Sequence, residues 1–462
     1  LTDGKARPIL DSIFSKRRYE GDRCKTVELT IDSTVQFIVE QELDKAMAEN
    51  GPKAITAVVM NPKTGEVLAM ASRPSYNPNR FAEYNAEVWK NRAVSFIYDP
   101  GSTFKSVVAA GALQEKVVSP NQVFVDPGYV MVSGRRIQNW NGESFGTVTF
   151  TDVVKNSLNT GFAQVGLRLG AENLTKYAQL FGFGVPTGIE LPAEEKGILF
   201  NPKDMRDSDI ATMAIGQSIA VTPLQLVTAM SAIANDGVLL KPHIIKSIKN
   251  ADGSVYRETQ PEEVRRTIES ATDKTLVGLL EQVVASGGGK KAAVKGYRIG
   301  GKTGTAQKIR EDGAGYMDGH YIASFCGFAP VEDPQLAVLV MIDDPSGIFY
   351  GGQIAAPVAS SIFSQLFRYL HIEPSSDPFA GMDKGHETVP KNLPKTTQQN
   401  AAQGKIVVPD LRGKTIREAA QELSAIGLKM DSDGSGVAQS QSVPPNSVVD
   451  TGTEVTVYFK PE

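Results

Sequence analysis

The sequence has few cysteines and few histidines for its 462 residues. The two cysteines, Cys24 and Cys326, lie about 300 residues apart, a spacing that matches no metal-binding or redox motif. The four histidines form no H-E-x-x-H or related pair, which argues against a zinc enzyme. We therefore expect no metal and no cofactor. We expect Cys326, which lies in an apolar run, to be a buried and unreactive thiol.

The chain also has no large excess of charge of either sign. Its 48 Lys and Arg residues and 52 Asp and Glu residues give a net charge of −4, which argues against a nucleic acid partner. Apolar residues make up 41% of the chain, and there are 43 glycines. This composition is ordinary for a globular protein and excludes disordered, collagen-like and disulfide-scaffold classes. At about 150 residues per domain, the length predicts roughly three domains.

Long apolar runs are missing as well. The uncharged stretch at residues 210–235 contains polar side chains and is interrupted by Pro223. We therefore expect a buried loop that leads into a core helix beginning at Pro223, and not a membrane span. The chain begins at Leu1 with neither a methionine nor an apolar leader. We expect an excised fragment, with any export or membrane signal removed or never present.

Alternation of apolar and polar residues predicts strands at both ends of one large unit. The first two strands form a hairpin around the turn at 61–65, after a helix that a capping box at Ser33 opens. A mostly helical insert fills residues 100–290, and a helix at about 354–370 follows the last strand. The pattern predicts an α+β fold with a five-stranded, largely antiparallel sheet flanked by helices. The expected strands are residues 54–60, 66–72, 297–310, 320–328 and 335–342.

Composition also predicts the domain boundaries. Residues 1–26 are polar and basic and are expected to form a connector, and residues 27–372 contain the large unit. Residues 373–404 are rich in Pro, Ser, Thr, Asn and Gln, which is typical of a linker. Residues 405–462 then form a small separate module.

Two formal motif matches lack the context that their chemistry needs. Residues 296–303 fit the P-loop pattern, but Gly304 follows where the phosphate-binding helix would have to begin. Residues 142–146 spell G-x-S-x-G, but a β-like run follows instead of a helix. We expect a strand at the first and a turn at the second, and therefore neither an ATPase nor a nucleophile elbow.

A serine and a lysine lie one helical turn apart in the segment D-P-G-S-T-F-K. Pro100 and Gly101 precede Ser102, and apolar residues follow, so we expect a buried helix that begins near Ser102 and carries Lys105 on the same face. A serine hydroxyl is a weak nucleophile unless a neighbouring base removes its proton. Lys105 can be that base only if burial or a nearby cation lowers its pKa. On its own, the pair is equally consistent with the solvated start of a helix.

A second short motif places Ser157 and Asn159 on either side of a leucine. From a turn, both side chains could point into one cleft, where the serine would relay a proton and the asparagine would hold a substrate amide. Taken alone, a helix cap or a loop is the simpler interpretation.

A third motif, G-G-K-T-G-T-A, predicts a strand. On a strand, Lys302 and Gly304 share one face, while Thr303 and Thr305 share the other. Lys302 would lower the pKa of a nearby lysine and attract a carboxylate, and Gly304 would leave room for a substrate. A lysine that merely protects an edge strand from aggregation would give the same pattern.

Together the three motifs, S-x-x-K, S-x-N and K-T-G, resemble those of the penicilloyl-serine transferase superfamily in type and order. Over about residues 27–370 the chain is similar to one branch, the class B penicillin-binding proteins, which are monofunctional peptidoglycan D,D-transpeptidases. Further segments that look like this family are L-T-I-D at 29–32, D-P-G-S at 99–102, F-G at 183–184, G-I-E-L-P at 188–192, A-I-G-Q at 214–217, G-G at 351–352 and A-A-P at 355–357.

The resemblance implies a penicillin-binding/β-lactamase-like fold and a catalytic role for four residues. Ser102 would form an acyl-enzyme with the stem peptide, and Lys105 would be its general base. Ser157 would pass the proton to the leaving amine, and Asn159 would orient the substrate amide.

The resemblance also implies a substrate-binding strand. Thr303 and Thr305 would bind the terminal carboxylate in the field of Lys302, with Gly304 between them. The oxyanion hole would consist of the backbone N–H groups of Ser102 and Thr305. The residue between Ser157 and Asn159 is a leucine and not the aspartate of class A β-lactamases, and no loop carboxylate is evident that would activate water. Slow release of a penicilloyl adduct is therefore expected.

The last module shows a second resemblance, to a PASTA domain. It is carried by V-V-P-D-L at 407–411, an expected helix at 419–428, P-P at 444–445, Gly452 and V-T-V at 455–457. In other proteins such modules are implicated in peptidoglycan or partner binding. A purely structural spacer is the alternative.

These resemblances imply peptidoglycan stem peptides as substrates, β-lactam antibiotics as inhibitors, and a membrane glycosyltransferase and divisome-type proteins as partners. The place of action would be the extracytoplasmic face of the bacterial plasma membrane, through an N-terminal anchor absent from this chain. Residues 1–26 would be the remnant of a non-catalytic module. The role would be in division or sporulation. Alternatives are a D,D-carboxypeptidase, in which water replaces the acceptor amine, and a β-lactam-sensing receptor domain.

Overall fold

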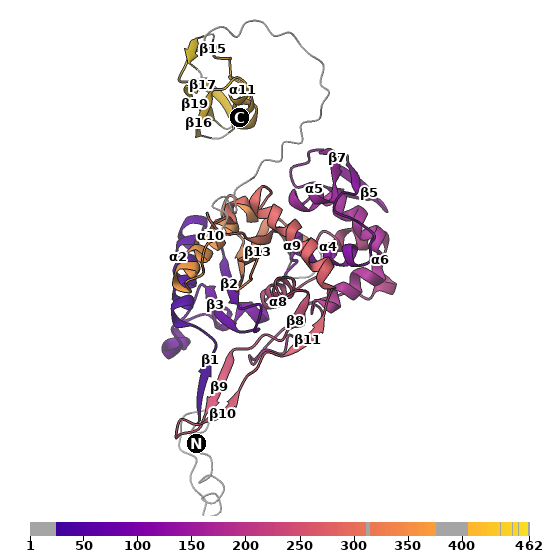
Figure 1. Cartoon of the computed structure of the whole chain (residues 1–462), viewed down its shortest axis with the longest axis vertical. Helices are drawn as coiled ribbons and strands as arrows, with labels where there is room; N and C mark the ends of the chain where they lie inside the picture. The colour runs from indigo at the N-terminus through magenta and orange to yellow at the C-terminus, as the bar shows by residue number, and fades with distance from the viewer. Residues whose placement is uncertain are drawn as a thin grey trace, which may run out of the picture. The chain divides into compact units, whose positions relative to one another are not determined.

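A five-stranded antiparallel sheet forms the centre of the larger unit (Figure 1). In order across the sheet, its strands are β12 (Gly300–Ile309), β13 (Tyr316–Ala329), β14 (Leu336–Asp343), β2 (Ala54–Met60) and β3 (Val67–Arg73). Ala337 of β14 pairs with Met60 of β2, so the two strands near the N-terminus join the three near the C-terminus, as predicted. Strand β12 is left at one edge of the sheet.

Successive side chains of each strand point to opposite faces of the sheet. Helices cover both of these faces. Ile55, Ala57 and Val59 of β2 pack into one core with α2 (Ser33–Asn50) and α10 (Gly351–Tyr369), which lie side by side in Figure 1. Val58 and Met60 face the other core, which contains α8 (Pro223–Ala234). Every residue of α8 is buried, which confirms the predicted core helix beginning at Pro223.

The computed structural model describes residues 25–310, 315–375, 405–434, 436–445, 447–450 and 452–460. The chain divides into two compact units, one within residues 1–385 and the other within 386–462. Most of the expected connector (1–26) and of the expected linker (373–404) lies outside the described residues. Within those residues, no helix combines the length and the apolar character needed to cross a membrane.

The region between the two parts of the sheet is mostly helical, as predicted. It contains α3 (Arg92–Ser95), α4 (Lys105–Gln114), α5 (Phe150–Lys155), α6 (Asn159–Leu180), α7 (Asp207–Met213), α8 and α9 (Ser270–Ala285). It also contains short 3-10 turns, namely η1 (Pro78–Glu83), η2 (Ala86–Trp89), η3 (Gly101–Thr103), η4 (Pro202–Asp204) and η5 (Lys290–Ala292).

Short strands accompany these helices, most of them outside the segments that the sequence marked as β-like. They pair as β4 (Val123–Asp126) with β7 (Gly146–Thr149), β5 (Tyr129–Val132) with β6 (Arg135–Gln138), β8 (Val238–Leu240) with β11 (Glu263–Arg266), and β1 (Thr26–Leu29) with β9 (Ile245–Lys249) and β10 (Val255–Glu258). Most have only three or four residues, so an alternating pattern has little length over which to show.

Several predicted helix starts need correction. The N-cap of α2 is Asp32 and not Ser33, because the Asp32 carboxylate accepts hydrogen bonds from the backbone N–H groups of Thr34 and Val35 at 2.8 and 3.0 Å. Helix α10 begins at Gly351, three residues before the predicted start at about 354, because two glycines weaken the helical pattern there. The hairpin of β2 and β3 is confirmed.

The smaller unit is an α/β module with its own core. It contains β15 (Lys405–Val407), α11 (Ile416–Ala425), β16 (Lys429–Gly434), β17 (Val437–Gln441), β18 (Val448–Asp450) and β19 (Glu454–Lys460). Its helix begins three residues before the expected range of 419–428 and ends at Ala425, because Gly427 adopts a positive φ of 78°. The core contains Val408, Leu423 and Val457.

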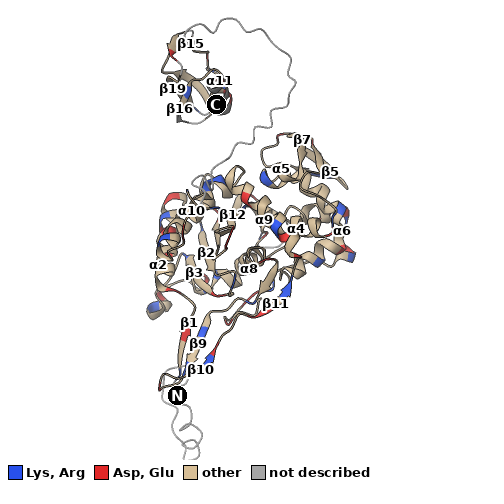
Figure 2. Ribbon diagram, viewed as in Figure 1, with Lys and Arg blue, Asp and Glu red and all other residues tan. Residues whose placement is uncertain are grey.

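Two expectations from composition can be followed in the structure. Cys326 lies on β13 with no exposed surface and forms no disulfide, and burial raises the pKa of its thiol above the usual range. Basic and acidic residues are interspersed along the elements of both units (Figure 2).

One buried carboxylate leads to a stability prediction. Asp273, in the first turn of α9, is 3% exposed, and its Oδ1 has no hydrogen-bond partner among the described residues. Burial, followed by the charge of Asp236, raises the pKa of Asp273 to about 8. The folded state therefore binds this proton more tightly than the unfolded chain, so this carboxyl destabilises the fold increasingly as pH rises from about 4 to about 8.

Asp273→Asn should remove this pH dependence. We expect the variant to match the wild type near pH 4 and to exceed it at pH 8 by at least about 1 kcal/mol in the free energy of unfolding. Urea unfolding at several pH values measures the difference. Asp207→Asn, in the exposed first turn of α7, is the matched control and should not gain stability at pH 8. Equal pH slopes for Asp273→Asn and wild type would contradict the prediction.

Candidate active site

Ser102 lies in a tight turn directly before α4. The sequence predicted that the helix begins near Ser102, but residues 101–103 form the 3-10 turn η3 and the α-helix begins only at Lys105. Gly101 has a positive φ of 54°, and the Thr103 hydroxyl donates a hydrogen bond to the carbonyl of Pro100 at 2.6 Å. This turn leaves Ser102 half-buried and in contact with a cleft.

Lys105 joins the first motif to the second. Its side chain is fully buried, and its Nζ lies 2.8 Å from the carbonyl oxygen of Ser157, 3.2 Å from the Ser157 hydroxyl and 2.7 Å from Asn159 Oδ1. Burial, reinforced by the charge of Lys302, holds the pKa of Lys105 well below its usual range. A neutral amine at this position can donate to two of these oxygens and accept a proton through its lone pair.

A strained turn explains how Ser157 and Asn159 reach the same lysine. Ser157 has a positive φ of 58°, which turns the chain sharply between the end of α5 and the start of α6. Leu158, between the two polar residues, is fully buried. The Asn159 side chain is fixed because its Nδ2 donates to the carbonyl of Gln138 at 2.7 Å. The predicted convergence of Ser157 and Asn159 on one cleft is what the structure shows.

The third motif lies on β12, with its side chains on two faces as predicted. Lys302 is 1% exposed, and burial lowers its pKa to about 7. Thr303 and Thr305 are half-buried and line the cleft. The Thr305 hydroxyl also accepts a hydrogen bond from the backbone N–H of Gly351, at 3.1 Å.

The predicted reason for Gly304 needs correction. A Cβ at this position would lie 2.5 Å from the Ser324 hydroxyl, 2.9 Å from the carbonyl of Pro100 and 3.0 Å from the Thr103 methyl carbon. The space beside Gly304 is therefore filled by the turn that carries Ser102. Close packing of this turn against β12, and not room for a substrate, accounts for the glycine.

Two more glycines complete this packing. A Cβ on Gly101 would lie 3.0 Å from the carbonyl oxygen of Thr305, on β12. On the other side of the turn, a Cβ on Gly216 would lie 1.8 Å from the carbonyl oxygen of Gly101, and the Gly101 N–H donates to the Gly216 carbonyl at 2.9 Å. The turn of Ser102 is thus held between β12 and the loop that contains Gly216.

The cleft that these motifs share has a volume of about 220 Å³. Its only charged lining residues are two exposed lysines of η5, Lys290 and Lys291, and Lys291 donates a hydrogen bond to Gln353 at 2.5 Å. Trp140 and Tyr350 form an edge-to-face aromatic pair at the cleft, with 5.2 Å between ring centroids.

The sequence analysis did not assign the residues 287–291 or Tyr350 and Gln353 to the site. Residues 287–291 read G-G-G-K-K and lie shortly before the third motif. This run could have indicated them, because glycines allow a loop to approach a strand closely. A Cβ on Gly352 would lie 2.4 Å from the Gly288 carbonyl, which shows how closely the two segments pack.

The discarded motifs behave as expected. Strand β12 continues through Lys302 to Ile309, so no helix follows the P-loop-like segment. Residues 142–145 are irregular and lead into β7. In the described part of the chain, no cluster of three or more His, Cys, Asp or Glu side chains could hold a metal ion.

Comparison with known proteins shows the family to which this chain belongs. Residues 55–364 match the model of the penicillin-binding protein transpeptidase domain, and residues 406–461 match that of the PASTA domain. The chain is 39% identical to stage V sporulation protein D of Bacillus subtilis over 441 residues, which are 94% of this chain and 65% of that protein. It is 37% identical to the peptidoglycan D,D-transpeptidase FtsI of Escherichia coli K12, over 75% of this chain and 57% of that protein.

A solved structure agrees with these matches. Penicillin-binding protein 3 from Mycobacterium tuberculosis, complexed with ampicillin, superposes with a TM-score of 0.72 at 34% identity, over 77% of this chain and 80% of that one. The chain spans 57% to 65% of the length of the two curated relatives named above. The predicted resemblance to class B penicillin-binding proteins is confirmed. This chain belongs to the penicillin-binding protein transpeptidase family and carries a PASTA domain after its transpeptidase domain.

Proposed function

We propose that this chain is the catalytic part of a peptidoglycan D,D-transpeptidase that acts through an acyl-enzyme on Ser102. The observation that carries the proposal is the position of Lys105. Its buried Nζ lies within 3.2 Å of both Ser157 and Asn159, close to the charge of Lys302, and three residues from a serine that lines the cleft. A depressed pKa makes such an amine a suitable base for a serine hydroxyl.

In the acylation step, Ser102 Oγ attacks the carbonyl carbon of the penultimate D-Ala, and Lys105 Nζ takes the hydroxyl proton. The backbone N–H groups of Ser102 and Thr305 stabilise the oxyanion, and each such donor typically contributes about 3–4 kcal/mol. As the C–N bond to the terminal D-Ala breaks, the proton passes through Ser157 to the leaving amine. An ester on Ser102 remains.

Deacylation reverses these roles. The amine of a second stem peptide attacks the ester carbonyl, gives its proton back through Lys105 and Ser157 to Ser102 Oγ, and forms the new amide bond. Asn159 holds the amide of the donor peptide. Before acylation, Thr303 and Thr305 bind the terminal carboxylate of the donor peptide, which leaves with the terminal D-Ala, and the charge of Lys302 favours this anion. We also propose partners and a place of action that suit this reaction. The partners are a membrane glycosyltransferase and divisome-type proteins, and the place is the extracytoplasmic face of the plasma membrane, where an anchor would hold the protein.

The test is to incubate the protein with a fluorescent penicillin and to map the adduct by mass spectrometry. We expect a single adduct on Ser102 that persists, because the residues lining the cleft include no carboxylate to activate water. Ser102→Ala should form none. Ser106→Ala should retain the adduct on Ser102. Ser106 lies one turn further along the chain, and its buried hydroxyl has no hydrogen-bond partner among the described residues. An adduct on another residue, or an undiminished one in Ser102→Ala, would refute the assignment.

A second measurement separates transpeptidation from its hydrolytic alternative. With a D-Ala-D-Ala peptide and an added amine acceptor, a transpeptidase should form the amide product in preference to the free acid. Release of D-Ala with the free acid as the only product would identify a carboxypeptidase. Acylation by penicillin without any turnover of peptide would point to a sensor.

A further inference from the structure

Three segments from distant parts of the sequence meet at the carboxyl group of Asp99, three residues before Ser102. The Tyr316 hydroxyl, on β13, donates a hydrogen bond to Asp99 Oδ2 at 2.8 Å. The backbone of Ser218 also favours the charged form of this carboxylate. Asp99 is only 3% exposed, so these two groups replace much of its contact with water.

The same three segments build the proposed active site. Asp99 belongs to the turn of Ser102, and Ser218 belongs to the loop whose Gly216 carbonyl accepts the Gly101 N–H. Tyr316 pairs with Ile309 at the far end of β12, the strand that also carries Thr305. The contact of Asp99 with Tyr316 thus links the turn that supplies the nucleophile to the hairpin of β12 and β13.

We propose that Asp99 and Tyr316 form a latch that holds the turn of Ser102 against this hairpin, and that acylation requires Asp99 in its charged form. This proposal rests on the proposed function, because it assigns Asp99 and Tyr316 as positioning residues for that reaction. Misplacement of reacting groups by about 1 Å can cost a factor of about 100 in rate. The two proposed oxyanion donors lie on the two segments that the latch joins. The N–H of Ser102 belongs to the turn, and the N–H of Thr305 belongs to β12.

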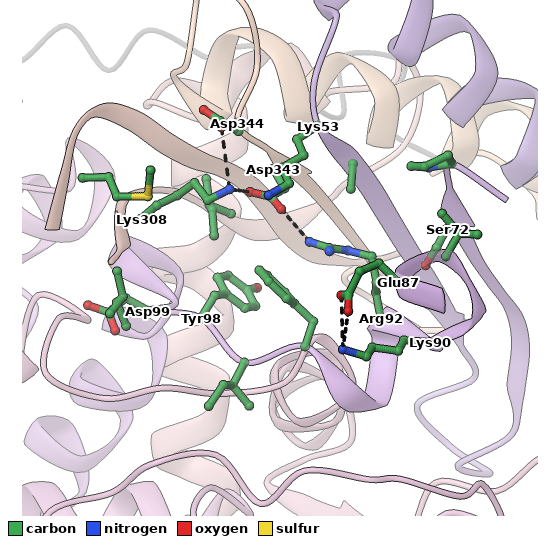
Figure 3. Close-up of a pocket in the computed structure, with 18 of the residues that line it drawn as sticks. Lys53, Ser72, Glu87, Lys90, Arg92, Tyr98, Asp99, Lys308, Asp343 and Asp344 are labelled. Atoms are coloured by element: carbon green, nitrogen blue, oxygen red, sulfur yellow. Dashed lines mark hydrogen bonds and ion pairs between the residues drawn. The ribbon is translucent and has the colours of Figure 1, made fainter. Parts of the chain in front are cut away.

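Asp99 lines one wall of a separate pocket of about 480 Å³ (Figure 3). Asp99 and Tyr98 lie below a row of ion pairs in this view, in which Asp343 binds Arg92 at 2.6 Å and Lys308 at 2.7 Å. These two cations are thus occupied by another carboxylate, and none of the described residues forms an ion pair with Asp99.

The other charged groups around the latch are few. In the same pocket, Lys90 is paired with Glu87 and Lys308 also approaches Asp344, while Lys53 lines the wall. From β6, Arg135 acts electrostatically on Tyr316. Asp99 therefore depends on two neutral groups for its charge.

Burial raises the pKa of Asp99 to about 6, even though Tyr316 and the backbone of Ser218 act in the opposite direction. The carboxylate is therefore charged above about pH 6 and becomes protonated below it. A hydrogen bond to a charged acceptor is roughly twice as strong as one between neutral groups. The latch should weaken as pH falls through this value.

The experiment measures the rate constant of acylation by a fluorescent penicillin from pH 5 to pH 8.5. In the wild type we expect a step near pH 6, with the faster rate on the alkaline side. Asp99→Asn imitates the protonated acid, so its rate at pH 8 should fall about tenfold and the step should vanish. Tyr316→Phe removes the latch bond itself, so its rate at pH 8 should also fall about tenfold, and any step that remains should lie at higher pH because the lost bond lowered the pKa of Asp99.

Tyr98→Phe is the matched control, because it also removes one phenol oxygen, from the residue that precedes Asp99 in the chain. The Tyr98 hydroxyl is buried and has no hydrogen-bond partner among the described residues, so the step should stay in place. Thermal unfolding of each variant checks that it is folded. If Asp99→Asn is not folded, Tyr316→Phe provides the test of the latch.

The two proposals fail in different ways. A step that persists unchanged in Asp99→Asn and Tyr316→Phe would overturn the latch alone, as would an equal shift in Tyr98→Phe. A wild-type protein that is not acylated at any pH would overturn the proposed function and the latch with it.

Discussion

Lys105→Met should reduce the rate of acylation of Ser102 by about 10²–10⁴-fold, the range in which a general base contributes to a reaction. Methionine is unbranched and only one heavy atom shorter than lysine, so it keeps most of the apolar contacts in the helical core, but it has no lone pair basic enough to take the serine proton. The residual rate should rise with pH, because hydroxide then replaces the missing base. Stopped-flow fluorescence with a labelled penicillin measures the rate.

The control for Lys105→Met is Lys155→Met. Lys155 lies two residues before Ser157, is partly exposed and pairs with Asp152 at 3.1 Å, so its loss removes a nearby charge without removing the base. We expect Lys155→Met to stay within about threefold of the wild type, since exposed ion pairs contribute little. An acylation rate for Lys105→Met within tenfold of the wild type would show that another group takes the proton.

Gly216→Ala should nearly abolish acylation and should also destabilise the protein. The new Cβ would lie 1.8 Å from the carbonyl oxygen of Gly101 and 2.5 Å from its carbonyl carbon, so the turn of Ser102 must move. Gly216 also has a φ of +83°, which costs a side chain about 1–2 kcal/mol, and overpacking adds about 1–3 kcal/mol. We expect a loss of about 100-fold or more in acylation rate.

A second glycine separates the two causes. Gly253 has a φ of +84°, but no atom lies within 4 Å of its missing Cβ. Gly253→Ala therefore carries the same backbone cost without the collision. It should lower the free energy of unfolding by about 1–2 kcal/mol and leave acylation unchanged. Comparable acylation by the two variants would show that the position of the turn is not critical.

Elements with strong local patterns were predictable. Examples are the hairpin of β2 and β3, the buried helix α8 and the strand β12. Each is marked by an apolar pattern or by turn residues that lie within a few positions of one another in the sequence. The family motifs then pointed to Ser102, Ser157, Asn159, Thr303, Gly304 and Thr305, which line the cleft, but not to the other residues around it.

Features set by tertiary packing were not predictable in this way. The purpose of Gly304 depends on Pro100 and Ser324, which are far from it in sequence, so the local pattern suggested room for a substrate instead. The lysines of η5 reach the cleft only because Gly288 packs against Gly352. The contact between Asp99 and Tyr316 spans 217 residues and leaves no trace in either local pattern.

The order of strands in the central sheet has a consequence for how the chain folds during its synthesis. Strand β2 finds its neighbour β14 only when residues 336–343 have left the ribosome, more than 270 residues after β2 itself. At typical bacterial rates of translation this delay is on the order of tens of seconds. A nascent chain that ends before residue 336 contains β12 and β13 but not β14, the strand that joins them to β2, so the five-stranded sheet can be completed only after residue 343 has emerged.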